Sequence, residues 1–134
     1  MPDVYSDVIG AVYNQIENST FDFQIVPSDY LGSFQNGEEH VTVAVNVSGT
    51  TPYYARSASS RNTGFVAFSI FTESGRGPSR AIEIINQLSD RFVYEKIGRF
   101  NFMGGETVHM GLDKENKSYD SHRFVVNFIQ YGDK

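Results

Sequence analysis

The chain has 134 residues, no cysteine and a formal net charge of -5. This length predicts one domain, residues 1–134, with a single hydrophobic core. The negative charge argues against direct, sequence-specific binding of nucleic acid because phosphates would be repelled, and the lack of cysteine excludes disulfides and thiolate zinc sites. No run approaches the roughly 18 consecutive apolar residues of a membrane helix, so no contact with a membrane is expected.

The first part of the chain predicts a helix, a short strand and a loop. Apolar residues recur at helical spacing over residues 4–17, and Asp3 can cap this helix. Phe21, Phe23 and Ile25 then alternate with polar residues up to a proline, which is typical of a short strand. A polar, glycine-containing loop is expected over residues 28–39.

Two strands in the middle of the chain have different hydrophobic patterns. Residues 40–48 alternate valine with polar or small residues, which predicts one buried face. Residues 64–72 are apolar on both faces, which is typical of a central strand. Between them, residues 49–63 are too many for a tight hairpin turn and predict a protruding, flexible arm.

The sequence of the remaining part of the chain predicts a second helix and three strands. Helical spacing runs over residues 78–93, and Pro78 suits the first turn. Short strands are expected over residues 99–103 and 107–112, around two glycines, and a final strand over 123–131. The charged connection before that last strand predicts a second exposed hairpin tip. The fold class is therefore α+β: a mixed, mostly antiparallel sheet, two main helices on one face and protruding hairpin arms.

Motifs for catalysis or cofactor binding are weak. The turn Gly75-Arg76-Gly77-Pro78-Ser79 precedes a helix but matches no established phosphate loop. The loop carboxylates of Glu38 and Glu39, or of Asp113 and Glu115, are expected to stay solvated and unspecialised. His40, His109 and His122 show no second ligand at helical or hairpin spacing, so no metal site is predicted. We expect no enzyme activity and no cofactor.

The order of elements resembles a known family. An amphipathic helix, a valine-rich strand and a long arm precede Gly64-Phe65-Val66-Ala67-Phe68-Ser69-Ile70-Phe71, the turn Gly75-Arg76-Gly77 and the helix Ala81 to Phe92. With the closing strand, this arrangement is similar to the tail terminator, or tail completion, proteins of long-tailed bacteriophages. The loop after the first strand is longer than that family suggests.

The resemblance implies a structural function. It implies a homo-oligomeric ring, a hexamer, that caps the tail tube at the head-proximal end of the virion, stops tail polymerisation and forms the head-joining surface. The implied partners are other copies of the chain, the tail tube protein and a head-side connector or stopper protein, with assembly in the host cytoplasm.

Candidate partner contacts come from the two predicted arms. Tyrosine and arginine are enriched in interface hot spots, and the second tip adds two lysines and a tyrosine. The candidates are Tyr53, Tyr54, Arg56, Arg61, Lys114, Lys117 and Tyr119. A disordered loop accounts for the first arm's composition equally well.

Other functions remain open on the sequence alone. A head-tail connector or stopper protein could have the same pattern. A small ligand-binding or enzymatic α+β domain would need polar groups that converge from distant residues, and an adaptor domain would bind an extended peptide at an open sheet edge.

Overall fold

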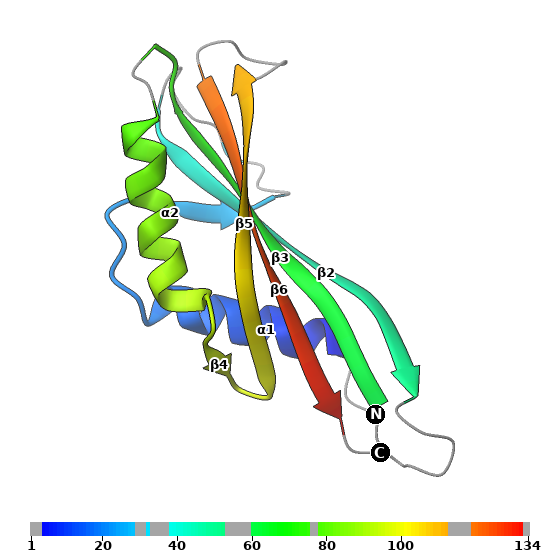
Figure 1. The fold of residues 1–134 in the computed structure, drawn as a ribbon. Helices are drawn as coiled ribbons and strands as arrows, with labels where there is room; N and C mark the ends of the chain where they lie inside the picture. Colours follow the sequence, from blue (N-terminus) through cyan, green and yellow to red (C-terminus); the bar gives the residue numbers. More distant parts are fainter. Residues whose placement is uncertain are drawn as a thin grey trace.

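The computed structural model describes residues 4–28, 32, 38–52, 60–75, 78–112 and 119–132. Its elements are α1 (Val4–Glu17), β1 (Ile25–Pro27), β2 (His40–Pro52), β3 (Ser60–Glu73), α2 (Ser79–Phe92), β4 (Lys96–Ile97), β5 (Phe100–Leu112) and β6 (Tyr119–Gly132). The strands form a six-stranded sheet in the order β1-β2-β3-β6-β5-β4 (Figure 1). β1 runs parallel to β2, and the other neighbouring strands are antiparallel. The predicted α+β class is confirmed.

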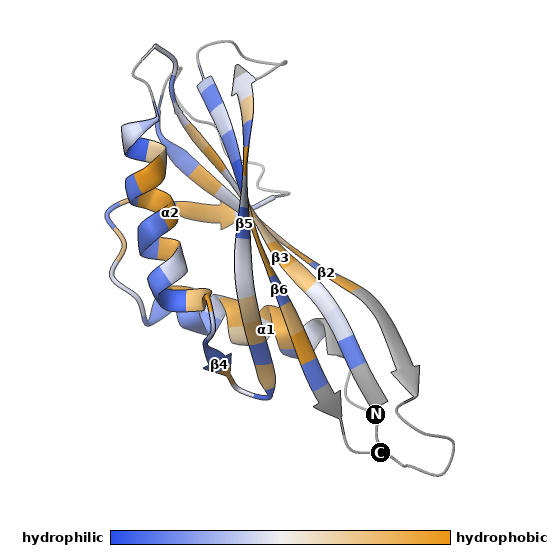
Figure 2. Ribbon diagram, viewed as in Figure 1, coloured by the Kyte–Doolittle hydropathy of each residue, from blue (hydrophilic) through white to orange (hydrophobic). Residues whose placement is uncertain are grey.

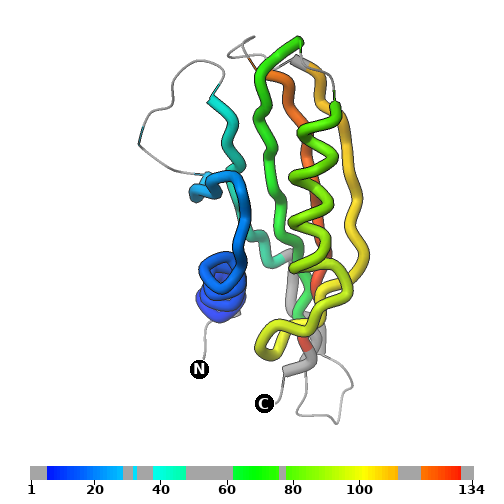
Figure 3. Tube along the Cα trace, turned by 90° about the vertical axis from the view of Figure 1, so that its left-hand side faces the viewer, coloured from blue at the N-terminus to red at the C-terminus, as the bar shows by residue number. Residues whose placement is uncertain are grey.

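Both helices cover the same face of the sheet. In Figure 3, α2 runs alongside the strands and α1 is seen nearly end-on. The buried residues of α2 are spaced three to four positions apart, which gives the helix one apolar stripe. They are Ala81, Ile84, Leu88 and Phe92. Val8 and Val12 of α1 are also fully buried, and Figure 2 shows the hydrophobic residues gathered where helices and sheet meet.

The strand patterns place the core as the sequence predicted. Val41 and Val43 of β2 are buried while Ala44 is exposed, so the alternation defines one core face. β3 lies between β2 and β6 and buries Val66, Ala67 and Phe68, which confirms a central strand with apolar residues on both faces. The final strand buries its predicted face through Phe124, Val126 and Phe128.

The phenylalanine-rich composition fills this core. The ring of Phe68 lies 5.2 Å from that of Phe92, centroid to centroid, and Phe92 makes an edge contact with Phe102 at 5.9 Å. Phe128 contacts Phe102 at 5.7 Å and Phe100 at 5.6 Å. Such pairs add about 0.5–1.5 kcal/mol each beyond burial of their area, so this chain of rings ties α2 to β3, β5 and β6.

Four features differ from the predictions. β5 is one strand rather than two, because the two glycines at 104–105 sit within a register shift, not a turn. β6 begins at Tyr119, four residues before the predicted start at 123. Residues 49–52 and 60–63 of the predicted flexible arm continue β2 and β3 as a paired hairpin; its tip, 53–59, lies outside the described residues. The predicted strand from Phe21 forms only at Ile25–Pro27.

Arg80 joins three segments at the start of α2. Its guanidinium donates from Nε and Nη2 to the two carboxylate oxygens of Glu39, at 2.7 and 2.8 Å. It also bonds Asp22, with Nη2 donating to Oδ1 at 3.1 Å. The hydrogen bond from Arg80 lowers the pKa of Asp22, and that with Glu39 raises the pKa of Arg80. Glu39, one of the loop carboxylates that were expected to stay solvated, therefore has a structural partner.

Replacing Arg80 by Gln is expected to lower the free energy of unfolding by about 1 kcal/mol, since a two-point arginine–carboxylate pair of partly exposed groups stabilises the fold only modestly more than a single surface ion pair does. Urea denaturation of the variant, of Glu39→Gln and of the double variant measures the coupling. A coupling energy near zero would show that the pair contributes nothing.

Candidate assembly surface

The β5 edge of the sheet is open over most of its length. β4 covers only the start of β5, pairing Lys96 with Asn101 and Ile97 with Phe100. Two further backbone bonds follow, from Phe102 N to Glu95 O at 2.9 Å and from Tyr94 N to Met103 O at 3.3 Å. From position 104 to 112, no described residue pairs with this edge. Unpaired edge strands are templates for pairing with another chain.

This open segment also carries exposed apolar side chains. Val108 is 44% exposed and Met110 is 58% exposed, and Met103, just before the open segment, is 44% exposed. Every residue from 105 to 110 is exposed, so the strand projects beyond the layer that the helices cover. Lysine and proline, which commonly protect free edges, do not occur between positions 103 and 112.

A second open segment lies on the opposite edge of the sheet, in β2. β1 pairs with β2 only as far as Val43, where Ser28 N donates to Val43 O at 3.0 Å. From position 44 to 52, no described residue pairs its backbone with the outer edge of β2. Figure 1 shows the free part of β2 at the lower end of the sheet and that of β5 at the upper end.

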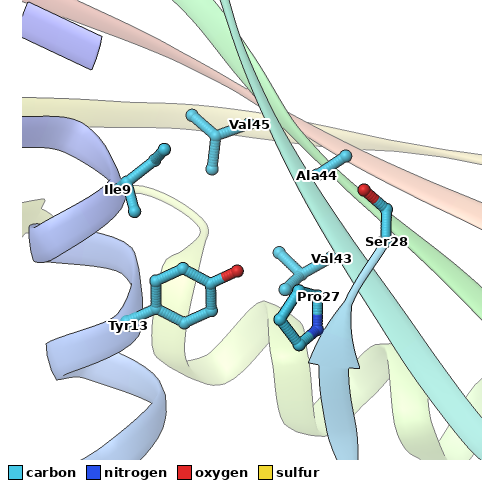
Figure 4. Close-up of a pocket in the computed structure, with 7 residues that line it drawn as sticks. All are labelled: Ile9, Tyr13, Pro27, Ser28, Val43, Ala44 and Val45. Atoms are coloured by element: carbon cyan, nitrogen blue, oxygen red, sulfur yellow. The ribbon is translucent and has the colours of Figure 1, made fainter. Parts of the chain in front are cut away.

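A hollow of about 270 Å³ lies where the cover of β2 stops. Ile9 and Tyr13 of α1 line one side, and the strand residues face them (Figure 4). The strand side consists of Pro27, Ser28, Val43, Ala44 and Val45. Most of these side chains are apolar, but the accessible wall of the hollow is more polar than apolar, so it offers hydrogen-bonding groups as well as apolar surface.

Most of the predicted contact residues lie outside the described residues: Tyr53, Tyr54, Arg56, Lys114 and Lys117. The backbone of Arg61 pairs with Thr51 and Tyr131 within the sheet. The expectation that Tyr119 is exposed at a hairpin tip is wrong. It is the first residue of β6 and only 6% exposed, because its ring packs against Phe71 and His40 at centroid distances of 5.8 and 5.2 Å.

The structure also contradicts the reasoning that no histidine has a second ligand at hairpin spacing. His109 and His122 are paired across β5 and β6, and their rings stack with centroids 4.4 Å apart. His109 Nε2 lies 3.0 Å from Asp120 Oδ1. Burial lowers the pKa of His122, with a further contribution from His109, while Asp120 opposes the shift. This pair was not expected because the last strand was predicted to begin only at residue 123. β6 begins at Tyr119, which includes His122 in the strand opposite His109.

The candidate anion-binding turn before α2 falls partly outside the described residues, at 76–77. Pro78 occupies the N-cap position of the helix, where no side chain caps it. His40, the third histidine, stacks on Phe71 and lies apart from the pair on β5 and β6.

Neither described helix has the length and apolar character needed to span a bilayer. No protein-family model matches the chain, and no curated protein does. Among solved structures, it is similar to a chain of the "Virion of native gene transfer agent (GTA) particle", with a TM-score of 0.61 and 15% identity over 93% of each chain. The two chains therefore share a fold over nearly their whole length.

Proposed function

We propose that this chain is a structural subunit of a virion, with a tail-terminator function and not an enzymatic one. Copies would form a ring, a hexamer by the family resemblance, at the head-proximal end of the tail tube. The ring would stop the tail from polymerising and present a surface to a head-side connector or stopper protein. The resemblance in the order of elements and the fold shared with a virion chain support this proposal.

The observation that carries it is the pair of open edges on opposite sides of one sheet. A ring needs two different, complementary surfaces on each subunit, so that each copy binds one neighbour with each surface. β5 runs antiparallel to β2 through the intervening strands. Rotation about the ring axis leaves the direction of each strand along that axis unchanged. β5 of one copy can therefore pair antiparallel with β2 of the next copy.

The open part of β5 also offers apolar surface. It presents Val108 and Met110, which are 44% and 58% exposed. Pairing with β2 of a neighbouring copy would cover part of these side chains. The net charge of -5 opposes close approach of copies, so apolar burial and backbone hydrogen bonds have to supply the favourable free energy.

The two free segments lie at opposite ends of their edges, so neighbouring copies are offset along the strand direction (Figure 1). Strands that close a cylinder with such a stagger are tilted relative to its axis, as in β-barrels. The proposal therefore specifies a ring whose strands are inclined to the central channel.

The first experiment measures solution mass by light scattering after size exclusion, across a range of protein concentrations, together with negative-stain imaging. We expect rings that become more abundant with concentration. A protein that stays monomeric at the highest concentration, and that also fails to cap tubes made from its cognate tail tube protein, contradicts the proposal. Rings that leave tube growth unchanged would favour the connector or stopper alternative.

A further inference from the structure

A cluster of three potential metal ligands lies at the upper end of the β5–β6 hairpin. His109 on β5 is opposite His122 on β6, and Asp120 precedes His122 by two residues on the same face. One ligand atom from each residue lies within 4.8 Å of the other two. The side chain of His109 is 59% exposed and that of Asp120 is 18% exposed, while His122 as a whole is 5% exposed. The cluster is therefore open on one side.

Buried polar atoms gather around the same cluster. Among the described residues, two buried side-chain atoms have no hydrogen-bond partner, Thr72 Oγ1 and His122 Nδ1. Thr72 is the cross-strand neighbour of Asp120 on β3, so both atoms belong to this end of the sheet. Native proteins contain few such atoms, and each calls for an explanation, such as a functional role or a bound water or ion.

We propose that His109, Asp120 and His122 bind one divalent transition-metal ion of the Zn²⁺ type. Two imidazole nitrogens and one carboxylate oxygen are a donor set that suits zinc, cobalt or nickel, whereas calcium and magnesium prefer oxygen ligands alone. Three protein ligands leave a fourth position for water or for a group from a partner.

The geometry requires a small movement. Zinc bonds of about 2.0–2.2 Å in a tetrahedral site place ligand atoms roughly 3.3 Å apart. The contact of 3.0 Å between His109 Nε2 and Asp120 Oδ1 is close to that spacing. The most distant ligand atoms, within 4.8 Å, have to approach by up to about 1.5 Å, and the exposed His109 ring can make most of that movement. The bound ion would clamp β5 to β6 beside the open edge.

The test uses tag-free, chelator-treated protein titrated with Zn²⁺ in a calorimeter, and with Co²⁺ followed by visible absorption. We expect one ion per chain and a Tm that rises with zinc concentration. His109→Ala should weaken binding at least tenfold. Thr107→Ala, an exposed residue two positions along β5, is the matched control and should bind as the wild type does.

Asp120→Asn gives a second, independent variant. It keeps the shape of a side chain that is 18% exposed and removes its charge, so folding should persist while zinc binding weakens at least tenfold. The proposal is overturned if the wild type shows no saturable binding, if His109→Ala and Asp120→Asn both bind zinc unchanged, or if magnesium binds equally well. Half an ion per chain with a doubled mass would also overturn it, because the ion would then link two molecules.

Discussion

A mixture of two edge-blocked variants is expected to form dimers, although neither variant assembles alone. The first is Val45→Pro on β2. Val41 N and Val43 O both point toward β1, and residues alternate along a strand, so the N–H of Val45 points to the open edge. Proline removes this donor without breaking the β2–β3 ladder.

The second variant carries Val108→Lys and Met110→Lys on β5, because lysine on an edge strand opposes pairing with another strand. Each variant keeps one intact edge, and the intact edges differ. One interface can therefore form in the mixture, but a ring cannot close. Light scattering should give monomer mass for each variant and dimer mass for the mixture.

Two controls separate assembly from folding. Ala44→Pro should destabilise the protein, since its N–H points toward β3, whereas Val45→Pro should keep a Tm near that of the wild type. Ile82→Lys, at a position on α2 that is 51% exposed, should still form rings. If the mixture stays monomeric, or if either edge variant forms rings, β2 and β5 do not bind each other.

Gly64→Ala is expected to lower the free energy of unfolding by about 3 kcal/mol, because the added methyl group has no space. Gly64 lies in the central strand β3, where a Cβ would collide with the backbone oxygen of Asn46 and lie 2.6 Å from Cζ of Phe128. The backbone oxygen is held by the β2–β3 pairing, and Phe128 is buried. Neither neighbour can move without loss of packing.

Gly10→Ala is the matched control for this substitution. Gly10 lies in α1, is exposed, and has no atom within 4 Å of an added Cβ. Alanine there should raise the unfolding free energy by about 0.5–1 kcal/mol through helix propensity. Urea denaturation of both variants measures the difference. A Gly64→Ala protein as stable as the wild type would show that the sheet relaxes around the new methyl group.

Local periodicity was enough to predict both helices and the two middle strands. The apolar stripe of α2 and the valine alternation of β2 repeat over several turns or residues, so each pattern identifies its own element. The central position of β3 followed from apolar residues such as Phe68 and Ala67 on opposite faces.

Register and pairing could not be predicted from local patterns. Residues 119–122 are polar apart from one tyrosine, and they join β6 because β3 on one side and β5 on the other supply hydrogen bonds. The pairing of His109 with His122 follows from that extension. The open edges likewise depend on where β1 and β4 stop, which tertiary packing decides.

The position of β6 has a consequence for synthesis. β6 comes last in the sequence, yet it lies between β3 and β5, and its pairs with β3 join residues as distant as Ser60 and Gly132. Pairing between residues so far apart in the sequence is slow, and it cannot be completed until the whole of β6 has been synthesised. A nascent or truncated chain without β6 cannot hold β2 and β5 in one sheet. In the proposed assembly, chains that lack β6 would thus present at most one joining edge, and translation would delay assembly until β6 has been made.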